Sequence, residues 1–240
     1  MSLIPLVVTG GAVAVFDLEL VKRLRRLGIV GVFSGTLPKT PQQNVFLGLP
    51  LQLSLYEALW LVEKGYGVLV DGPRYHEQLM LLGASQAQRV EILPGIEYAV
   101  VGNTYEEVDE EKLSGIVART VVRPADLKAR LFGADNRRVG VYCAAFAVLR
   151  EMNYYLMPGL RFGGDFVAYP GDPLQFHSHL IVRVLQEGES FDLLQLVTSG
   201  RLATAVKKVW VLMGEDGERD AEKDGFVPMK SFSIEWAGFG

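Results

Sequence analysis

Two histidines separated by one residue are the first feature of this 240-residue sequence that suggests chemistry. Of its three histidines, His177 and His179 stand together in "LQFHSHLIV". Residues two apart on a β-strand point to the same face, so the pair has the spacing of two metal ligands, most often for zinc. A third ligand would come from Asp165, Asp172 or His76, none of which has a diagnostic spacing. One packed and one partly exposed histidine on an ordinary strand would give the same pattern.

A tyrosine and two cations are the next candidates. Tyr169 ends the apolar run before "PGDP", and a four-residue turn there would bring it to the same end of a sheet as His177. In "SGRLATAVKK", Arg201 and Lys208 are two helical turns apart and would share a helix face, whereas Lys207 would be rotated by about 100°. Taken singly, each has a simpler interpretation, because strand tyrosines usually pack and helix cations are usually solvated.

The elements expected before residue 73 form a small α/β domain. "MSLIPLVVTGGAVAVF" predicts a strand, a tight turn and a second strand, and it lacks the basic leading region of a signal peptide. "FDLELVKRLRRLGI" predicts an amphipathic helix that ends at Gly28. "LSLYEALWLVEKG" predicts another, with Ser54 and Glu57 as a capping box and Gly65 after its end. "YGVLVDGP" predicts a strand, and no segment predicts a membrane span.

The rest of the chain divides into a linker or insertion region at 73–139 and a second domain at 140–240. "RVEILPGIEYAVVG" predicts short strands and "TYEEVDEEKLSGIVART" an acidic helix. A helix stopped by Pro158 and Gly159 opens the second domain, and a hairpin follows around "PGDP". "FDLLQLVTSGRLATAVKK" predicts a helix interrupted near Ser199 and Gly200, before two final strands, "VWVLM" and "KSFSIEWAGFG". The fold class is therefore α+β.

Composition limits the possible functions. Hydrophobic residues make up 49% of the chain, which is ample for packed cores. The net charge of −4 argues mildly against a protein that binds nucleic acids in bulk, so any such role needs a few placed residues or partner subunits. The one cysteine, Cys143, excludes an intramolecular disulfide and a Cys-cluster zinc site. We expect it to be a small core residue in an intracellular, reducing compartment.

Two stretches together resemble a known family. "RFGGDFVAYPGDPLQFHSHLIV" followed by "GRLATAVKKVWVL" is similar to the nuclease domain of the tRNA-splicing endonucleases, a restriction-endonuclease-like mixed-sheet domain. The "YPGDP…FH" form resembles the eukaryotic catalytic subunit assigned to the 3′ splice site. "GIVGVFSGTLPKTPQQNVFLGLPLQL" resembles the N-terminal domain of that subunit, and "FSIEWAGFG" resembles fungal members. One departure is that residues 73–139 are short and fairly apolar, where eukaryotic members usually carry a long charged insertion.

The resemblance implies a catalytic triad of Tyr169, His177 and Lys208. In the implied metal-free reaction, the tyrosine takes the proton of a ribose 2′-hydroxyl, the histidine protonates the leaving 5′-oxygen, and the lysine stabilises the phosphorane. The products carry a 2′,3′-cyclic phosphate and a 5′-hydroxyl. The resemblance also implies that Arg201 and Trp236 clamp a flipped intron base, a contact thought to serve the active site of the partner catalytic subunit.

The same resemblance implies partners and a location, and no cofactor. The substrate is pre-tRNA, a small non-catalytic subunit is the direct partner, and the second catalytic subunit brings a non-catalytic partner of its own. Such an assembly explains how a chain of net charge −4 acts on RNA. The implied location is the nucleus or the cytosolic surface of mitochondria. His179 has no catalytic counterpart and is expected to be structural. Two other hypotheses stay open, a non-catalytic scaffold with this fold and a His-x-His metal-binding protein.

Overall fold

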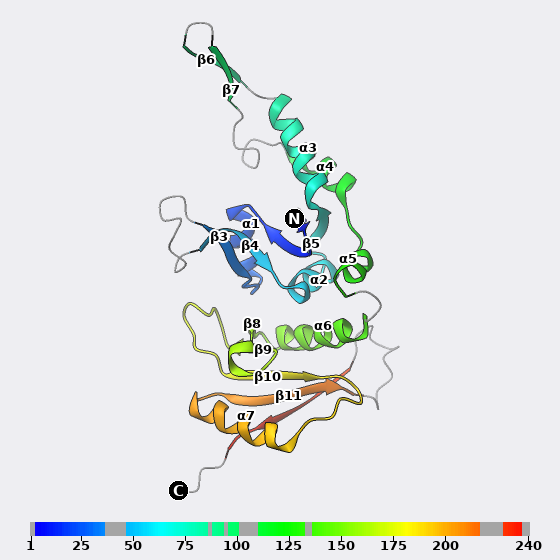
Figure 1. Ribbon diagram of the computed structural model, residues 1–240, viewed down its shortest axis with the longest axis vertical. Coiled ribbons are helices and arrows are strands. Elements are labelled where there is room, and N and C mark those ends of the chain that lie inside the picture. Colours follow the sequence, from blue (N-terminus) through cyan, green and yellow to red (C-terminus); the bar gives the residue numbers. More distant parts are fainter. Residues whose placement is uncertain are drawn as a thin grey trace. The chain divides into compact units, whose positions relative to one another are not determined.

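The computed structural model describes residues 3–36, 47–85, 88–93, 96–100, 110–132, 136–216 and 228–236. The chain divides into two compact units, one made of Met1–Val21 and Val32–Leu131 and the other of Lys22–Gly31 and Phe132–Gly240. Each unit contains its own five-stranded sheet (Figure 1). Most of the charged segment "GEDGERDAEKDG" and of the acidic run before Glu110 lies outside the described residues. Within the described residues, no helix has the length and apolar character needed to cross a membrane.

The sheet of the first unit is mixed. Its strands, in the order β3-β4-β2-β1-β5, are β1 (Ile4–Thr9), β2 (Ala12–Val15), β3 (Val32–Thr36), β4 (Leu47–Leu53) and β5 (Gly67–Asp71). Strands β1 and β5 run parallel, whereas β2 pairs antiparallel with β1. Gly10 and Gly11 form the tight turn between β1 and β2 with φ angles of 56° and 89°, which only glycine adopts readily. The predicted strand-turn-strand is confirmed.

The helices of the first unit cover this sheet. They are α2 (Leu55–Glu63), α3 (Gly72–Ser85), α4 (Glu110–Thr120) and α5 (Pro124–Phe132), and the hairpin of β6 (Gln88–Leu93) and β7 (Ile96–Val100) follows α3. The predicted capping box of α2 is present, because the Ser54 hydroxyl accepts from the Glu57 amide and the Glu57 carboxylate accepts from the Ser54 amide. Helix α1 (Leu18–Arg26) begins in the first unit and ends in the second.

The second unit is a mixed sheet between helices. Its strands, in the order β12-β11-β10-β9-β8, are β8 (Tyr155–Pro158), β9 (Phe166–Tyr169), β10 (Leu180–Leu185), β11 (Val209–Glu215) and β12 (Met229–Ile234). The helices are α6 (Asn136–Glu151), the short 3-10 helix η1 (Leu160–Phe162) and α7 (Leu193–Ala205). Strands β10 and β11 are parallel and are joined through α7. Helices α6 and α7 lie on opposite faces of this sheet (Figure 1), so the predicted α+β mixed-sheet domain is confirmed.

The first helix of the second unit is shorter than predicted. Helix α6 ends at Glu151. Residues Tyr155–Pro158, which were expected to continue the helix, form strand β8 instead. Asn153 has a φ of 64°, and its amide and that of Tyr154 bond back to carbonyls of the last helical turn. This arrangement terminates a helix, and asparagine tolerates it better than most residues. Cys143 lies on α6 and is only partly buried, not fully buried as expected.

The predicted hairpin has a much longer connection than four residues. Strand β10 begins at Leu180, so residues 170–179 form a loop and neither His177 nor His179 lies on a strand. The carbonyl of Asp172 accepts from the amides of Gln175 at 2.8 Å and Phe176 at 3.0 Å. These bonds close a local turn after "PGDP", and this turn lengthens the connection. The prediction that the two histidines share a strand face is therefore wrong.

Helix α7 is also different from the prediction. It is continuous through Ser199 and Gly200. Gly200 is buried, and the side of its Cα where a Cβ would stand faces Ile234 of β12. It ends at Ala205, before either lysine.

The two lysines lie in the turn that terminates α7. Lys207 adopts a φ of 55°, and the Lys208 amide bonds to the Ala203 carbonyl at 2.8 Å, which is a left-handed helix terminus. Lys208 therefore stands between α7 and β11 and does not share a helix face with Arg201, contrary to the prediction.

Candidate active site at one end of the second sheet

Strand pairing brings the neighbours of Tyr169 and Lys208 to one end of the second sheet. Leu180, at the start of β10, pairs with Ala168 of β9 and with Val209 of β11. Tyr169 directly follows Ala168 and Lys208 directly precedes Val209. Because adjacent strands lie about 4.8 Å apart, the backbones of Tyr169 and Lys208 lie about 10 Å apart.

The loop 170–179 returns the chain to the same end of the sheet. The His179 amide donates to the Ala168 carbonyl at 2.9 Å, and the His179 carbonyl accepts from the Val209 amide at 2.9 Å. Ser178 is buried and His177 is exposed. His177 thus stands two residues before the point where the chain rejoins the sheet, close to the ends of β9 and β11. The structure therefore brings Tyr169, His177 and Lys208 to one end of a sheet.

The side chains at this end are available to a ligand. Within the described part of the chain, those of Tyr169 and His177 make no hydrogen bond or ion pair, and Tyr169 is half-buried. The Lys208 ammonium lies 5.4 Å from the centroid of the Phe162 ring and 3.4 Å from the Val206 carbonyl oxygen. Both contacts hold the ammonium without neutralising it, so its charge is free to meet an anion.

Arg201 and Trp236 also meet, although one lies on α7 and the other follows β12. The guanidinium carbon of Arg201 is 5.9 Å from the centroid of the Trp236 indole. Both side chains are exposed, and Trp236 retains 41% of its accessible surface. Trp210 of β11 pairs with Ile234, so Trp236 projects from the same end of the sheet as Lys208. The two residues form an exposed cation–π pair.

The candidate third metal ligands have other partners. Asp165 is bound by Arg183 at 3.2 Å and Asp172 by Arg25 at 2.9 Å, while His76 lies on α3 in the first unit. Among the described residues, His, Cys, Asp and Glu side chains nowhere gather in a group of three or more suited to a metal ion. The His-x-His hypothesis therefore lacks a third ligand there. Sequence reasoning missed both ion pairs, because their members lie far apart in the chain.

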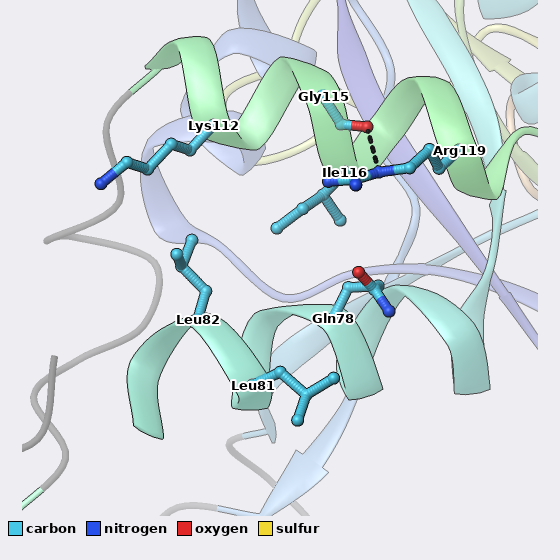
Figure 2. A pocket seen from close by; sticks show the side chains of 7 residues that line it. All are labelled: Gln78, Leu81, Leu82, Lys112, Gly115, Ile116 and Arg119. Atoms are coloured by element: carbon cyan, nitrogen blue, oxygen red, sulfur yellow. Dashed lines mark hydrogen bonds between the residues drawn. The ribbon is translucent and has the colours of Figure 1, made fainter. Parts of the chain in front are cut away.

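A separate hollow lies between α3 and α4 in the first unit (Figure 2). Its volume is about 350 Å³, and it is lined by Gln78, Leu81, Leu82, Lys112, Gly115, Ile116 and Arg119. The Arg119 Nε donates to the Gly115 carbonyl at 3.1 Å, so this cation is turned back onto its own helix. The five candidate residues Tyr169, His177, Arg201, Lys208 and Trp236 all belong to the second unit.

Comparison with known proteins matches two separate parts of the chain to family models. The family model described as "TSEN34-like, N-terminal domain" matches residues 4–72, and "tRNA intron endonuclease, catalytic C-terminal domain" matches residues 140–223. The "Probable tRNA-splicing endonuclease subunit sen34" of Schizosaccharomyces pombe is 35% identical, over 98% of this chain and 98% of the relative. This chain belongs to the tRNA-splicing endonuclease family. The family resemblance inferred from the sequence is confirmed.

Other endonucleases of this family are also similar over most of their length. The Saccharomyces cerevisiae "tRNA-splicing endonuclease subunit SEN34" is 32% identical, over 94% of this chain and 98% of the relative. The "tRNA-splicing endonuclease" of the archaeon Pyrobaculum aerophilum is 26% identical, over 85% and 86%. The match to the catalytic domain makes this chain an endonuclease subunit with a nuclease domain. That match includes Tyr169, His177, Arg201 and Lys208, and Trp236 lies beyond its end.

Proposed function

We propose that this chain is the catalytic subunit that cuts pre-tRNA at the 3′ splice site, with Tyr169, His177 and Lys208 as its triad. The observation that supports the proposal most strongly is the meeting of these residues at one sheet end, from the ends of β9, the loop 170–179 and the start of β11. The exposed His177 and the cation of Lys208 give this end the groups that RNA cleavage requires.

The proposed reaction assigns one task to each side chain. Tyr169 removes the proton of the ribose 2′-hydroxyl, and the 2′-oxygen attacks the adjacent phosphorus. His177 donates a proton to the leaving 5′-oxygen as the phosphorus–oxygen bond breaks, which gives a 2′,3′-cyclic phosphate and a 5′-hydroxyl. Lys208 offsets the charge that develops on the phosphorane.

The pair of Arg201 and Trp236 is proposed to hold a flipped intron base for the partner catalytic subunit. The 5.9 Å between the Arg201 guanidinium carbon and the centroid of the Trp236 indole is slightly short for a base between them. Such a base stacks on both groups, and two stacking distances of about 3.4 Å sum to about 7 Å. The exposed pair opens by about 1 Å to admit the base. Stacking of this kind contributes about 1–3 kcal/mol per base, and it fixes the scissile phosphate for in-line attack.

Replacing both clamp residues with alanine tests this role. Arg201→Ala with Trp236→Ala is expected to slow mainly the 5′ cut in the reconstituted complex, by about 5- to 150-fold if the stacking energy is lost. The rates of both cuts on one pre-tRNA give the measurement. Selective loss of the 3′ cut would contradict the assignment of the clamp to the partner site.

The proposed assembly contains a small non-catalytic subunit as direct partner, and a second catalytic subunit with its own non-catalytic partner. Strand β12 supports this proposal, because it is the outer strand of its sheet and most of its residues are exposed. Such an edge offers backbone groups to a strand of another chain. We infer that the assembly acts in the nucleus or on the cytosolic surface of mitochondria.

The decisive experiment replaces His177 in the reconstituted four-subunit complex. His177→Ala is expected to lower the 3′ cut by about 10²- to 10⁴-fold, while the complex assembles and the 5′ cut continues. His179→Ala is the matched control and is expected to retain both cuts. An unchanged 3′ cut in His177→Ala would refute the triad and favour the scaffold hypothesis, and selective loss of the 5′ cut would exchange the two splice-site assignments.

A further inference from the structure

An ion pair joins the loop 170–179 to the last turn of α1 within the second unit. The Arg25 Nη2 lies 2.9 Å from the Asp172 Oδ1, and the two side chains retain 26% and 31% of their accessible surface. Asp172 stands between Tyr169 and His177 in the chain. Neither member of the pair has a task in the proposed reaction, although the pair contacts the segment that connects the proposed base and the proposed acid.

The fold of this loop depends on Asp172. The same Oδ1 accepts from the Leu174 amide at 2.9 Å, and the Asp172 carbonyl accepts from the amide of Phe176 at 3.0 Å. A Cβ placed on Gly171 would lie 2.6 Å from the Phe176 ring, so the loop folds tightly back on itself. His177 directly follows Phe176. The orientation of the Asp172 carboxylate therefore sets the turn from which His177 emerges.

The end of α1 is itself fixed to the body of the second unit. Arg150 of α6 donates from Nη2 to the Leu27 carbonyl at 2.6 Å, and its guanidinium lies 5.3 Å from the centroid of the Tyr155 ring. Gly28 has a φ of 76°, and a Cβ there would overlap the Arg150 guanidinium. Tyr155 of β8 pairs with Tyr169 of β9. The helix that carries Arg25 is thus held by α6, whose Arg150 also packs on β8, the strand that pairs with the strand of the proposed base.

We propose that Arg25 is a positioning residue for RNA cleavage, which acts through Asp172 to hold His177 opposite Tyr169. The inference rests on the proposed function of the triad. A partly exposed ion pair adds only about 0.2–1 kcal/mol to stability. A displacement of about 1 Å in a catalytic group, by contrast, can slow a reaction about 100-fold. The pair therefore acts mainly on the rate of cleavage and only weakly on folding.

Single-turnover cleavage by the reconstituted complex tests the role of Arg25. Arg25→Met keeps the apolar stem and removes the charge, and it is expected to lower the maximal single-turnover rate of the 3′ cut about 10-fold, with the half-saturating concentration of the complex and the melting temperature close to wild type. Arg25→Lys restores a single-point ion pair and is expected to bring the rate within about 3-fold of wild type. Arg26→Met, on the exposed neighbour, removes the same charge and is expected to cut at the wild-type rate.

The partner residue gives a second measurement. Asp172→Asn keeps an acceptor for the Leu174 amide but loses the charge, and it is expected to slow the 3′ cut to a similar extent. If the two residues act as one unit, the double variant Arg25→Met with Asp172→Asn cuts no more slowly than the slower single variant.

Three results would overturn the role of Arg25. They are a wild-type rate in Arg25→Met, fully additive losses in the double variant, and a rate that falls only as far as the melting temperature predicts. The His177→Ala variant separates the two proposals. If it still cuts at the 3′ site, the triad itself fails. If it is inactive while Arg25→Met is unimpaired, only the positioning role fails.

Discussion

The two ends of the sheet in the second unit use polar residues in opposite ways. At the start of β9, the Asp165 carboxylate accepts from the Tyr142 hydroxyl at 3.1 Å, from Arg183 at 3.2 Å and from the backbone amide of Val184 at 2.8 Å. At the other end of β9, the side chains of Tyr169 and His177 make no hydrogen bond with the part of the chain that the structure describes. The Asp165 carboxylate has all its partners within the chain, although the Nε of Arg183 beside it is buried without one. We call this the satisfied end and the end of Tyr169 and His177 the open end.

This difference separates stability from activity. A buried or half-buried polar group whose bonds are satisfied contributes to folding, and removing a partner leaves an unmet group that costs free energy. Polar groups without internal partners contribute little to folding, and they keep their hydrogen-bonding capacity for a substrate. Substitutions at the open end are therefore expected to change rate, and substitutions at the satisfied end to change stability.

Of the substitutions that compare the two ends, Lys208→Met at the open end is expected to have the largest effect. Loss of the ammonium removes the stabilisation of charge on the phosphorane, so the 3′ cut is expected to slow by about 10²- to 10³-fold. The apolar stem keeps its place beside Phe162, and the melting temperature is expected to stay near wild type. Single-turnover cleavage and thermal unfolding give the two measurements. Lys207→Met is the neighbouring control, and a large loss of stability in Lys208→Met would erase the contrast between the two ends.

A smaller effect is expected for Asp165→Asn at the satisfied end. The substitution removes the charge that pairs with Arg183, and it is expected to lower the free energy of unfolding by about 1–3 kcal/mol. The cleavage rate of the folded complex is expected to remain close to wild type. Urea unfolding measures the loss. Asp126→Asn breaks a solvent-exposed pair with Arg123 and serves as control, and its free energy of unfolding is expected to change little because water screens such a pair. Equal costs in the two variants would contradict the special role of Asp165.

The smallest effect concerns pH at the satisfied end. Burial raises the pKa of the Tyr142 hydroxyl, and the nearby Asp165 carboxylate raises it further, whereas Arg138 opposes the shift. The folded chain therefore holds this proton more tightly than the unfolded chain. The resulting contribution to stability is complete below about pH 10 and is lost as the pH rises through the pKa of the folded state. Urea unfolding between pH 9 and 11 is expected to show a shallower decline in Tyr142→Phe, and identical declines would refute this origin.

Local sequence signals predicted the parts of the fold that local chemistry determines. The glycine pair after β1 and the Ser54 capping box need only neighbouring residues, and both were predicted. The ends of α6 and α7 were not, because each depends on one residue in the left-handed region. Asn153 was a usable signal for the first, since asparagine adopts this conformation more readily than most residues. Lys207 gave no signal for the second.

The candidate site was predicted from the resemblance and not from spacing. Spacing placed His177 on a strand and Lys208 on a helix face, and the structure places both in connecting segments. The residues nevertheless meet, because the pairing of β9, β10 and β11 brings those connections to one end of the sheet. The ion pair of Arg25 and Asp172 was invisible in the sequence, since the partners lie far apart in the chain and neither type is unusual at its position.

The unequal exposure of the tryptophans gives the molecule a built-in optical reporter. Trp210 retains 1% of its accessible surface in the core beneath α7, whereas Trp236 retains 41% beside Arg201. A buried indole emits at shorter wavelength than an indole in water, so the emission of Trp236 is expected at longer wavelength than that of the buried Trp210 and the partly buried Trp60. If Trp236 clamps a base as proposed, stacking is expected to quench the long-wavelength part of the emission and to leave that of Trp210 unchanged. Fluorescence of the unlabelled protein would then report entry of the base before any bond is cut.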